Sequence, residues 1–232
     1  MRIAICEDEI TQTRIIELYL REMAVKYHIE EIATYASGEN LYRAITLNNQ
    51  YDFYLLDIDL PGISGVELGS MLRKTDSDAG LVFITDYPQY VTQAFTLESA
   101  QYLLKPVKSE VFMCTMSRLF DDYEKLHITY VQENERLLNL RIKDIISVEF
   151  YYGEIIINTF ADVYRFRTNV KQEKARLVKM RFLRTHQGYY VNPSHIEKIC
   201  QDCIHCANDI CVPISSRQRK KLLEDFHRYY SK

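Results

Sequence analysis

Five polar residues of complementary chemistry follow short apolar runs in the first half of the chain. Two acids follow the first run, one acid follows the third, a threonine the fourth and a lysine the fifth: Glu7, Asp8, Asp57, Thr85 and Lys105. Clustered carboxylates repel one another unless a cation lies between them, and Mg²⁺ prefers such oxygen ligands and also binds phosphate. An aspartate can attack phosphorus, while a metal ion and an ammonium neutralise the phosphoryl oxygens. The set therefore predicts a phosphoacceptor site that uses magnesium.

The apolar runs that precede these residues have the length of buried β-strands. They cover residues 3–6, 32–35, 53–56, 81–84 and 102–104, and amphipathic stretches of helical periodicity separate them. Five repeats of this pattern predict an α/β fold with a doubly wound, five-stranded parallel sheet, in which ligands bind at the carboxyl ends of the strands. A single acid after a strand is usually a loop residue or a helix cap. Five such positions at four strand ends favour one shared site.

The order and spacing of these residues resemble the receiver domain of two-component response regulators. The resemblance rests on Glu7-Asp8, Asp57, Thr85 and Lys105-Pro106, and it covers about residues 1–123. It implies a flavodoxin-like fold, Mg²⁺ as cofactor and a sensor histidine kinase as the donor that phosphorylates Asp57.

The same resemblance assigns roles to the residues around Asp57. The metal ligands that it implies are acids near two strand ends: Glu7, Asp8, Asp57 and, through its backbone carbonyl, Asp59. Lys105 and Thr85 are expected to contact the phosphoryl group, and Tyr102 is expected to move inward with Thr85. An aromatic residue in an edge strand more often simply packs, so the role of Tyr102 depends on the resemblance alone. Pro106 is expected to follow a cis peptide bond.

The second half of the chain differs in charge and in pattern. Residues 1–123 hold 10 Lys and Arg against 19 Asp and Glu, whereas residues 124–232 hold 19 against 13. Alternating, strand-like segments dominate from about residue 128, with helices expected near 169–180 and from about 217. We therefore expect a receiver domain at 1–123, a short linker at 124–130 and a β-rich domain at 131–232. The basic residues gather at 165–184 and 217–221, which favours a polyanionic partner.

Three segments of the second domain, 144–149, 182–192 and 212–217, resemble the LytTR DNA-binding domain. That family is built from β-strands and reads DNA through loops, which correspond here to 151–154, 184–188 and 215–221. The implied DNA contacts are residues of the last two loops: Arg184, His186, Gln187, Ser216, Arg217 and Lys220. Arginine can grip guanine and glutamine adenine, whereas Arg184 and Lys220 are expected to meet phosphates. The first loop carries Glu154 and no basic group, and His186 is also suited to a structural hydrogen bond.

Together the two resemblances predict a response regulator that acts as a transcription factor and not as an enzyme. Phosphorylation of Asp57 is expected to promote a homodimer that binds double-stranded DNA at repeated half-sites. Two alternatives stay open: a receiver with a protein-interaction output, and a phosphatase of the haloacid dehalogenase type, which Asp57-x-Asp59 with Thr85 and Lys105 also resembles. The sequence has no signal peptide and no apolar run near the roughly 20 residues of a membrane span, so we expect a cytoplasmic protein without membrane insertion.

Six cysteines are present, and four of them lie close together near the end of the chain: Cys200, Cys203, Cys206 and Cys211. Their spacing, with His205 inside it, resembles a metal or iron–sulfur site. Side chains alternate along a strand, so Cys203 and Cys206 are expected on opposite faces, and four ligands would need a bulge or a loop. Reduced, packed cysteines are therefore the default expectation, with metal binding or redox sensing as the alternatives.

Overall fold

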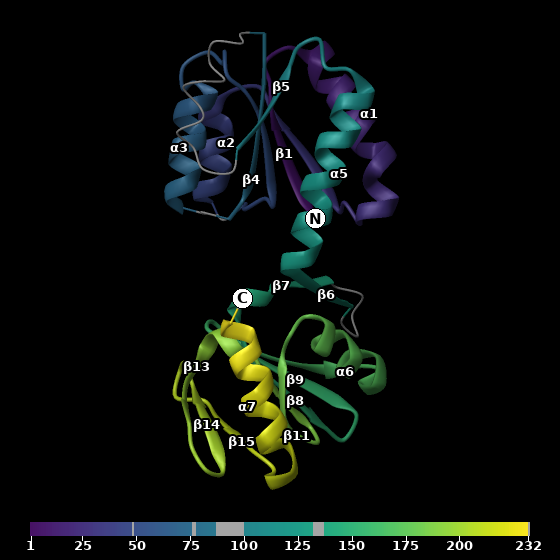
Figure 1. The fold of residues 1–232 in the computed structure, drawn as a ribbon. Coiled ribbons are helices and arrows are strands. Elements are labelled where there is room, and N and C mark those ends of the chain that lie inside the picture. The colour runs from purple at the N-terminus through teal and green to yellow at the C-terminus, as the bar shows by residue number, and fades with distance from the viewer. Residues whose placement is uncertain (48, 76–77, 87–99, 132–136, 232) are drawn as a thin grey trace. The chain divides into compact units, whose positions relative to one another are not determined.

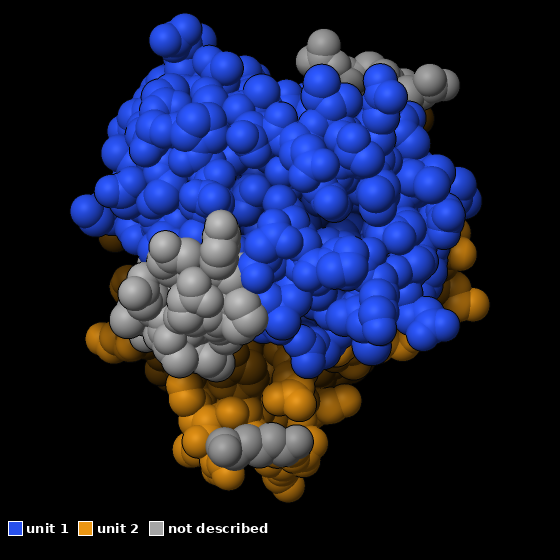
Figure 2. Space-filling model, turned by 90° about the horizontal axis from the view of Figure 1, so that it is seen from above, with its two compact units in different colours: residues 1–122 blue, residues 123–232 orange. Residues whose placement is uncertain are grey.

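The computed structural model describes residues 1–231 except 48, 76–77, 87–99 and 132–136. The chain divides into two compact units, Met1–Asp122 and Tyr123–Lys232, which Figure 2 distinguishes by colour. Helix α5 (Ser109–Leu126) continues past this boundary, and strand β6 (His127–Val131) follows it directly. The segment 124–130, expected to be a short linker, is thus built of helix and strand.

The first unit contains a five-stranded parallel sheet in the order β2-β1-β3-β4-β5. Its strands are β1 (Arg2–Cys6), β2 (Glu31–Tyr35), β3 (Phe53–Asp57), β4 (Gly80–Thr85) and β5 (Gln101–Leu104). The described helices are α1 (Ile10–Tyr27), α2 (Gly38–Thr46), α3 (Gly65–Thr75) and α5. Figure 1 shows α2 and α3 on one face of the sheet and α1 and α5 on the other. The predicted doubly wound fold is confirmed.

Each face of this sheet has its own hydrophobic core, because side chains alternate along the strands. Tyr54 of β3 belongs to the core on the α2–α3 side, where it joins Leu68. Its neighbour Phe53 packs against Phe120 of α5, with 4.9 Å between the ring centroids. Phe120 in turn contacts Tyr27 of α1 at 5.0 Å. Burial on both faces explains why the strands read as continuous apolar runs in the sequence.

The second unit is built around a five-stranded antiparallel sheet in the order β10-β9-β8-β12-β11. Its strands are β8 (Ile145–Tyr151), β9 (Glu154–Thr159), β10 (Val163–Arg167), β11 (Leu183–His186) and β12 (Tyr189–Val191). A second sheet joins β13 (Ile196–Ile199), β14 (Cys203–Cys206) and β15 (Cys211–Pro213), and β6 pairs with β7 (Leu137–Arg141). The helices are α6 (Val170–Lys179) and α7 (Ser216–Tyr230). The predicted β-rich domain is confirmed, and within the described ranges no helix has the length and apolar character to cross a membrane.

Two hydrophobic cores lie on opposite faces of the central sheet. One joins Val148 of β8 to the β6–β7 hairpin and to Leu177 of α6. The other joins Ile146 of β8 to Leu222 of α7 and to the three-stranded sheet. Ile146 and Val148 are two residues apart, and a regular strand would place them on the same face. A shift in the strand register near Ile146 explains why they face opposite sides, because a β-bulge there reverses the alternation of the side chains.

Candidate functional site

The acids and the lysine that the sequence singles out lie at the carboxyl edge of the first sheet. Asp57 is the last residue of β3, and its partner in β4 is Ile84, which immediately precedes Thr85. Glu7 follows β1 on the other side of β3, and Lys105 follows β5. Because all five strands are parallel, their carboxyl ends meet at one edge.

Lys105 bridges two buried carboxylates. Its Nζ donates to Asp57 Oδ2 at 2.7 Å and to Glu7 Oε1 at 3.1 Å, and it lies 2.9 Å from Glu7 Oε2. The exposed fraction of the side chain is only 1 % for Glu7, 5 % for Lys105 and 6 % for Asp57. Burial strengthens these contacts, but it also removes each charge from water, which costs free energy. One ammonium between two carboxylates leaves this buried charge cluster with an excess of negative charge.

The pKa values of the buried charge cluster reflect both burial and the charges within the cluster. Burial raises the pKa of Glu7 to about 7; the hydrogen bond from Lys105 opposes the rise, and the charge of Asp57 adds to it. Burial alone would lower the pKa of Lys105, but hydrogen bonds to Asp57 and Glu7 outweigh that effect, and the pKa is raised. Both shifts mean that the cluster holds protons more tightly than the isolated groups do. An additional cation at this position would offset the same excess.

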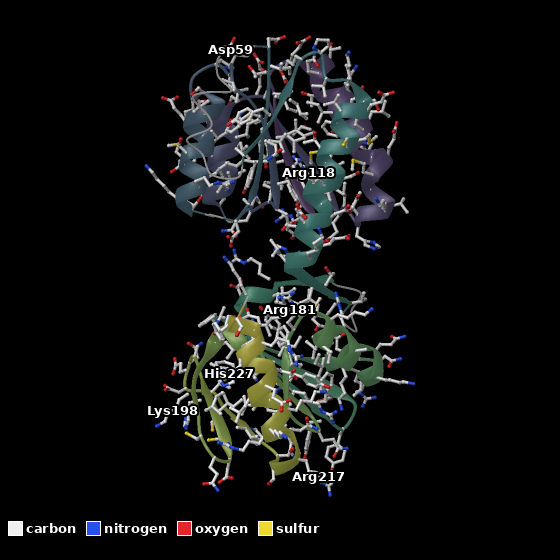
Figure 3. All side chains as sticks on the ribbon, in the orientation of Figure 1. Asp59, Arg118, Arg181, Lys198, Arg217 and His227 are labelled. Atoms are coloured by element: carbon white, nitrogen blue, oxygen red, sulfur yellow. The ribbon has the colours of Figure 1, made fainter. Side chains whose placement is uncertain are left out.

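Three carboxylates at this edge have the spacing of a cation site. One oxygen each from Glu7, Asp8 and Asp57 lies within 4.8 Å of the others, and Asp8 is exposed. Glu7 Oε2 is buried and accepts no hydrogen bond from the described residues, although the Lys105 ammonium lies 2.9 Å away. Hard carboxylate oxygens that outnumber the one ammonium beside them fit Mg²⁺. The side chain of Asp59 (labelled in Figure 3) is exposed and outside this group, while its backbone N–H donates to Asp57 Oδ1 at 3.1 Å.

The two expected switch residues lie on the neighbouring strands β4 and β5. Thr85 is fully buried at the end of β4, and its carbonyl accepts a hydrogen bond from the backbone N–H of Lys105 at 2.9 Å. Tyr102 stacks on Phe83 with 5.3 Å between ring centroids, and burial raises the pKa of Tyr102 to about 12. The expected cis peptide bond between Lys105 and Pro106 is present. Thr85 therefore borders the buried charge cluster, whereas movement of Tyr102 stays a prediction.

A glycine that sequence reasoning missed brings α3 close to Asp57. A Cβ on Gly65 would collide with the backbone carbonyl of Asp57, so only glycine permits this approach. The helix begins here with a capping box, because Ser64 N donates to Glu67 Oε2 at 3.1 Å and Glu67 N donates to Ser64 Oγ at 3.3 Å. A glycine directly after the capping serine is the signal in the sequence, but only the fold reveals which backbone it approaches.

In the second unit, the three loops expected to face DNA lie at one end of the central sheet. The turn after β11 is next to the β8–β9 turn, because Phe150 N donates to Gly188 O at 2.8 Å. The segment before α7 is next to the end of β11, because Ser215 N donates to Thr185 O at 3.0 Å. Residues 151–154, 184–188 and 215–221 therefore gather on one surface, which we call the loop face.

Most of the expected contact residues are exposed on the loop face. The exposed ones are Arg184, Gln187, Ser216, Arg217 and Lys220. Arg184 Nε donates to His186 O at 3.2 Å, and Lys174 Nζ donates to Gln187 O at 3.0 Å, so two cations brace the β11–β12 turn. His186 is half-buried, and its Nδ1 has no hydrogen-bond partner among the described residues. The structural hydrogen bond considered for His186 is therefore not made through Nδ1.

The basic residues of the second half do not all belong to the loop face. Arg181 and Arg217 lie at opposite ends of the second unit (Figure 3). Arg219, one residue away from Lys220, turns inward and donates to the carbonyl oxygens of Cys200 and Gln201. The run of charge in the sequence therefore divides into residues that face solvent at the loops and residues that brace the fold. Composition does not distinguish the two.

Two family models match the chain: a response regulator receiver domain over residues 3–116 and a LytTr DNA-binding domain over residues 135–227. The transcriptional regulatory protein LytR of Staphylococcus aureus (strain N315) is 28 % identical over 171 residues, which cover 67 % of this chain and 70 % of LytR. The sensory transduction protein LytT of Bacillus anthracis is 25 % identical over 169 residues, which cover 66 % and 69 %. The solved response regulatory domain of mrkE from Klebsiella pneumoniae aligns with 24 % identity and a TM-score of 0.48, covering 54 % of this chain and 99 % of that domain.

The two family matches fall within the two compact units. The receiver match contains every residue of the buried charge cluster, and the LytTr match contains the whole loop face. The alignments with LytR and LytT are each longer than either compact unit, so each alignment includes residues of both units. The chain therefore belongs to the two-component response regulators. Within them it is of the kind that joins a receiver domain to a LytTR DNA-binding domain and regulates transcription.

Proposed function

We propose that Asp57 accepts a phosphoryl group from a sensor histidine kinase, with Mg²⁺ held by Glu7, Asp8, Asp57 and the backbone carbonyl of Asp59. The observation that carries this proposal is the Lys105 bridge between Asp57 and Glu7, beside the exposed Asp8. We further propose that phosphorylation promotes a homodimer that binds repeated DNA half-sites in the cytoplasm. The working parts would be the receiver domain at 1–123 and the DNA-binding domain at 131–232, joined by 124–130.

Groups of the chain itself orient Asp57 for this reaction. Its Oδ1 accepts a hydrogen bond from Asp59 N and its Oδ2 accepts one from Lys105, so the carboxylate is fixed at the strand end. As an Asp57 oxygen forms its bond to phosphorus, the bond from phosphorus to the donor nitrogen breaks and its electron pair leaves with the imidazole. Lys105 then faces the new phosphoryl oxygens, to which Mg²⁺ supplies further positive charge when it is bound.

The charge added by phosphorylation would favour a change in the conformation of the receiver domain. A phosphoryl group brings nearly two negative charges to the end of β3. Thr85 follows the β4 partner of Asp57, which supports a role for its hydroxyl as a donor to a phosphoryl oxygen. The adjacent strand β5 carries Tyr102, which packs on Phe83 of β4, so a shift of β4 would reach Tyr102. Phosphorylation stabilises the active and inactive states of the receiver by different amounts of free energy. It can shift the equilibrium between these states by no more than that difference.

The phosphatase alternative has less support from the positions of the acids. An enzyme of the haloacid dehalogenase type uses acids beyond its lysine, and the candidates here are Asp121 and Asp122. Asp121 accepts a hydrogen bond from Tyr27, the last residue of α1, at 3.0 Å. The end of α1 is near the start of β1, because the Met1 ammonium donates to His28 O at 2.8 Å. Asp121 therefore lies toward the opposite edge of the sheet from Asp57.

Replacement of the phosphoacceptor gives the first prediction. Asp57→Ala removes the carboxylate that bonds to phosphorus, so intact-protein mass after incubation with Mg²⁺ and a small phosphodonor should show one phosphoryl group on the wild type and none on the variant. Glu22→Ala is the control, because it removes an exposed carboxylate of α1 that lies outside the metal group, and the adduct should persist. Catalytic turnover of the donor by the wild type, without an adduct, would favour the phosphatase instead.

The raised pKa of Glu7 predicts how stability depends on pH without metal. Above its ordinary pKa of 4.5 the unfolded chain has released this proton, while the folded chain keeps it until about pH 7. The free energy of unfolding should therefore fall, by up to about 3 kcal/mol, as the pH rises through this window. Urea unfolding in a chelator, followed by circular dichroism, should show this slope in the wild type and in Glu9→Gln, which changes an exposed acid. Glu7→Gln should be nearly flat, and a slope equal to that of the wild type would contradict the prediction.

The loop face generates a prediction about DNA binding. Arg217→Ala should weaken binding to an operator selected from a randomised duplex pool by roughly 5- to 150-fold, the range expected for loss of one good base contact. Arg228→Ala is the control, since Arg228 is an exposed arginine near the other end of the same helix. Fluorescence anisotropy at fixed salt measures both variants. Equal losses for Arg217→Ala and Arg228→Ala would indicate a general charge effect and would remove Arg217 from the recognition surface.

A further inference from the structure

The outer face of the three-stranded sheet in the second unit gathers sulfur and nitrogen groups that DNA binding does not use. Cys203 and His205 are two residues apart in β14, so their side chains lie on the same face. His205 is paired with Cys211 across the antiparallel ladder, which puts Cys211 on that face as well. Ile204 and Val212, the pair between them, are buried in the core on the opposite face.

A fourth ligand group comes from the turn between β13 and β14. Cys200 N donates to Cys203 O at 2.9 Å, which closes a tight turn with two residues between the cysteines. Ligand atoms of Cys200, Cys203 and His205 all lie within 4.8 Å of one another. Cys203 also hydrogen-bonds with Cys211, a contact that raises the pKa of Cys203. Cys206 is fully buried in the core, so the histidine, and not this cysteine, completes the set.

The distance between Cys203 and His205 agrees with tetrahedral coordination. Zn–S bonds of about 2.3 Å and Zn–N bonds of about 2.0–2.1 Å separate neighbouring ligand atoms of a tetrahedron by roughly 3.5–3.8 Å. Cys203 Sγ and His205 Nε2 are 3.7 Å apart. Three thiolates around Zn²⁺ leave one net negative charge, and Lys198 of β13 is the partner of His205 in the sheet register, where its ammonium can offset that charge.

We propose that one Zn²⁺ ion binds on this face through four ligands: Cys200, Cys203, His205 and Cys211. Binding displaces the thiol protons into solvent, because the thiolate is the form that coordinates the metal. The spacing Cys-x2-Cys in a turn, followed by ligands from a hairpin, is that of a structural zinc site with no open position.

This zinc site would brace the segment that leads into the loop face. Arg219 of α7 donates to Cys200 O at 2.5 Å and to Gln201 O at 2.6 Å. Ile214, two residues before α7, donates from its backbone N–H to Asp202 O at 2.8 Å. The turn that holds two of the ligands is thus hydrogen-bonded on both sides of the N-terminus of α7. Zinc binding fixes this turn and, through it, the start of the helix that carries Arg217.

Cobalt and zinc titrations of the full-length chain test the proposal. The reduced protein is stripped of metal with a chelator and titrated with Co²⁺, and then with Zn²⁺ against a coloured chelator. One Co²⁺ per chain should produce tetrahedral ligand-field bands and thiolate-to-cobalt charge-transfer absorption, which the carboxylates of the receiver domain cannot produce. Zn²⁺ should displace it. Hydrogen exchange over residues 200–219 should slow when Zn²⁺ is added.

Serine variants locate the site. Cys203→Ser should weaken Zn²⁺ binding by more than about 100-fold, since loss of an outer-shell partner alone costs 10–100-fold, and it should abolish the effect on hydrogen exchange. Cys114→Ser, at an exposed cysteine of α5, is the matched control and should bind as the wild type does. If circular dichroism shows that Cys203→Ser is unfolded, Cys211→Ser and His205→Ala replace it, because both change exposed positions. These two variants should also weaken Zn²⁺ binding. Absence of thiolate absorption, equal binding by the ligand variants, or thiols that only form a disulfide on oxidation would overturn the proposal.

Discussion

A single buried ammonium between two buried carboxylates governs the chemistry of the first unit. Lys105 contacts both Asp57 and Glu7, yet one positive charge does not balance two negative charges, and the pKa of Glu7 is raised, first by burial and then by the charge of Asp57. Removing charges from water is costly, and a cluster that is incompletely paired lowers stability more than a paired one does. The same imbalance makes the position favourable for a divalent cation and, with that cation, for a phosphoryl group. Under the proposed function, folding and signalling would depend on the same electrostatic feature.

The architecture keeps this cluster together. Parallel strands bring the ends of β1, β3, β4 and β5 to one edge, and Gly65 lets α3 begin directly against the backbone of Asp57. In the second unit, antiparallel turns and the start of α7 meet at the loop face through backbone hydrogen bonds from Phe150 and Ser215. In both units the functional groups lie on loops and strand ends that a rigid sheet positions.

Much of this organisation can be predicted from the sequence because it depends on local pattern and strand direction. Continuous apolar runs indicate the parallel strands, and the acids that follow them must then share one edge. Other features depend on contacts between distant segments, which periodicity does not contain. The approach of Gly65 to Asp57, the inward turn of Arg219 and the β-bulge that divides Ile146 from Val148 are of this kind. Alternation correctly separates Cys203 from Cys206 and puts His205 on the face of Cys203, but only the strand register shows that Cys211 shares this face.

The most direct test of the charge imbalance is the Mg²⁺ affinity of Lys105→Met, measured by isothermal titration calorimetry beside Lys108→Met, which changes an exposed lysine nearby. Lys105 competes with the metal for the carboxylates, so its removal should tighten Mg²⁺ binding by about tenfold or more, while phosphorylation from a small donor slows. Lys108→Met should bind Mg²⁺ as the wild type does. Unchanged or weaker Mg²⁺ binding by Lys105→Met would contradict the view that unbalanced negative charge is what recruits the cation.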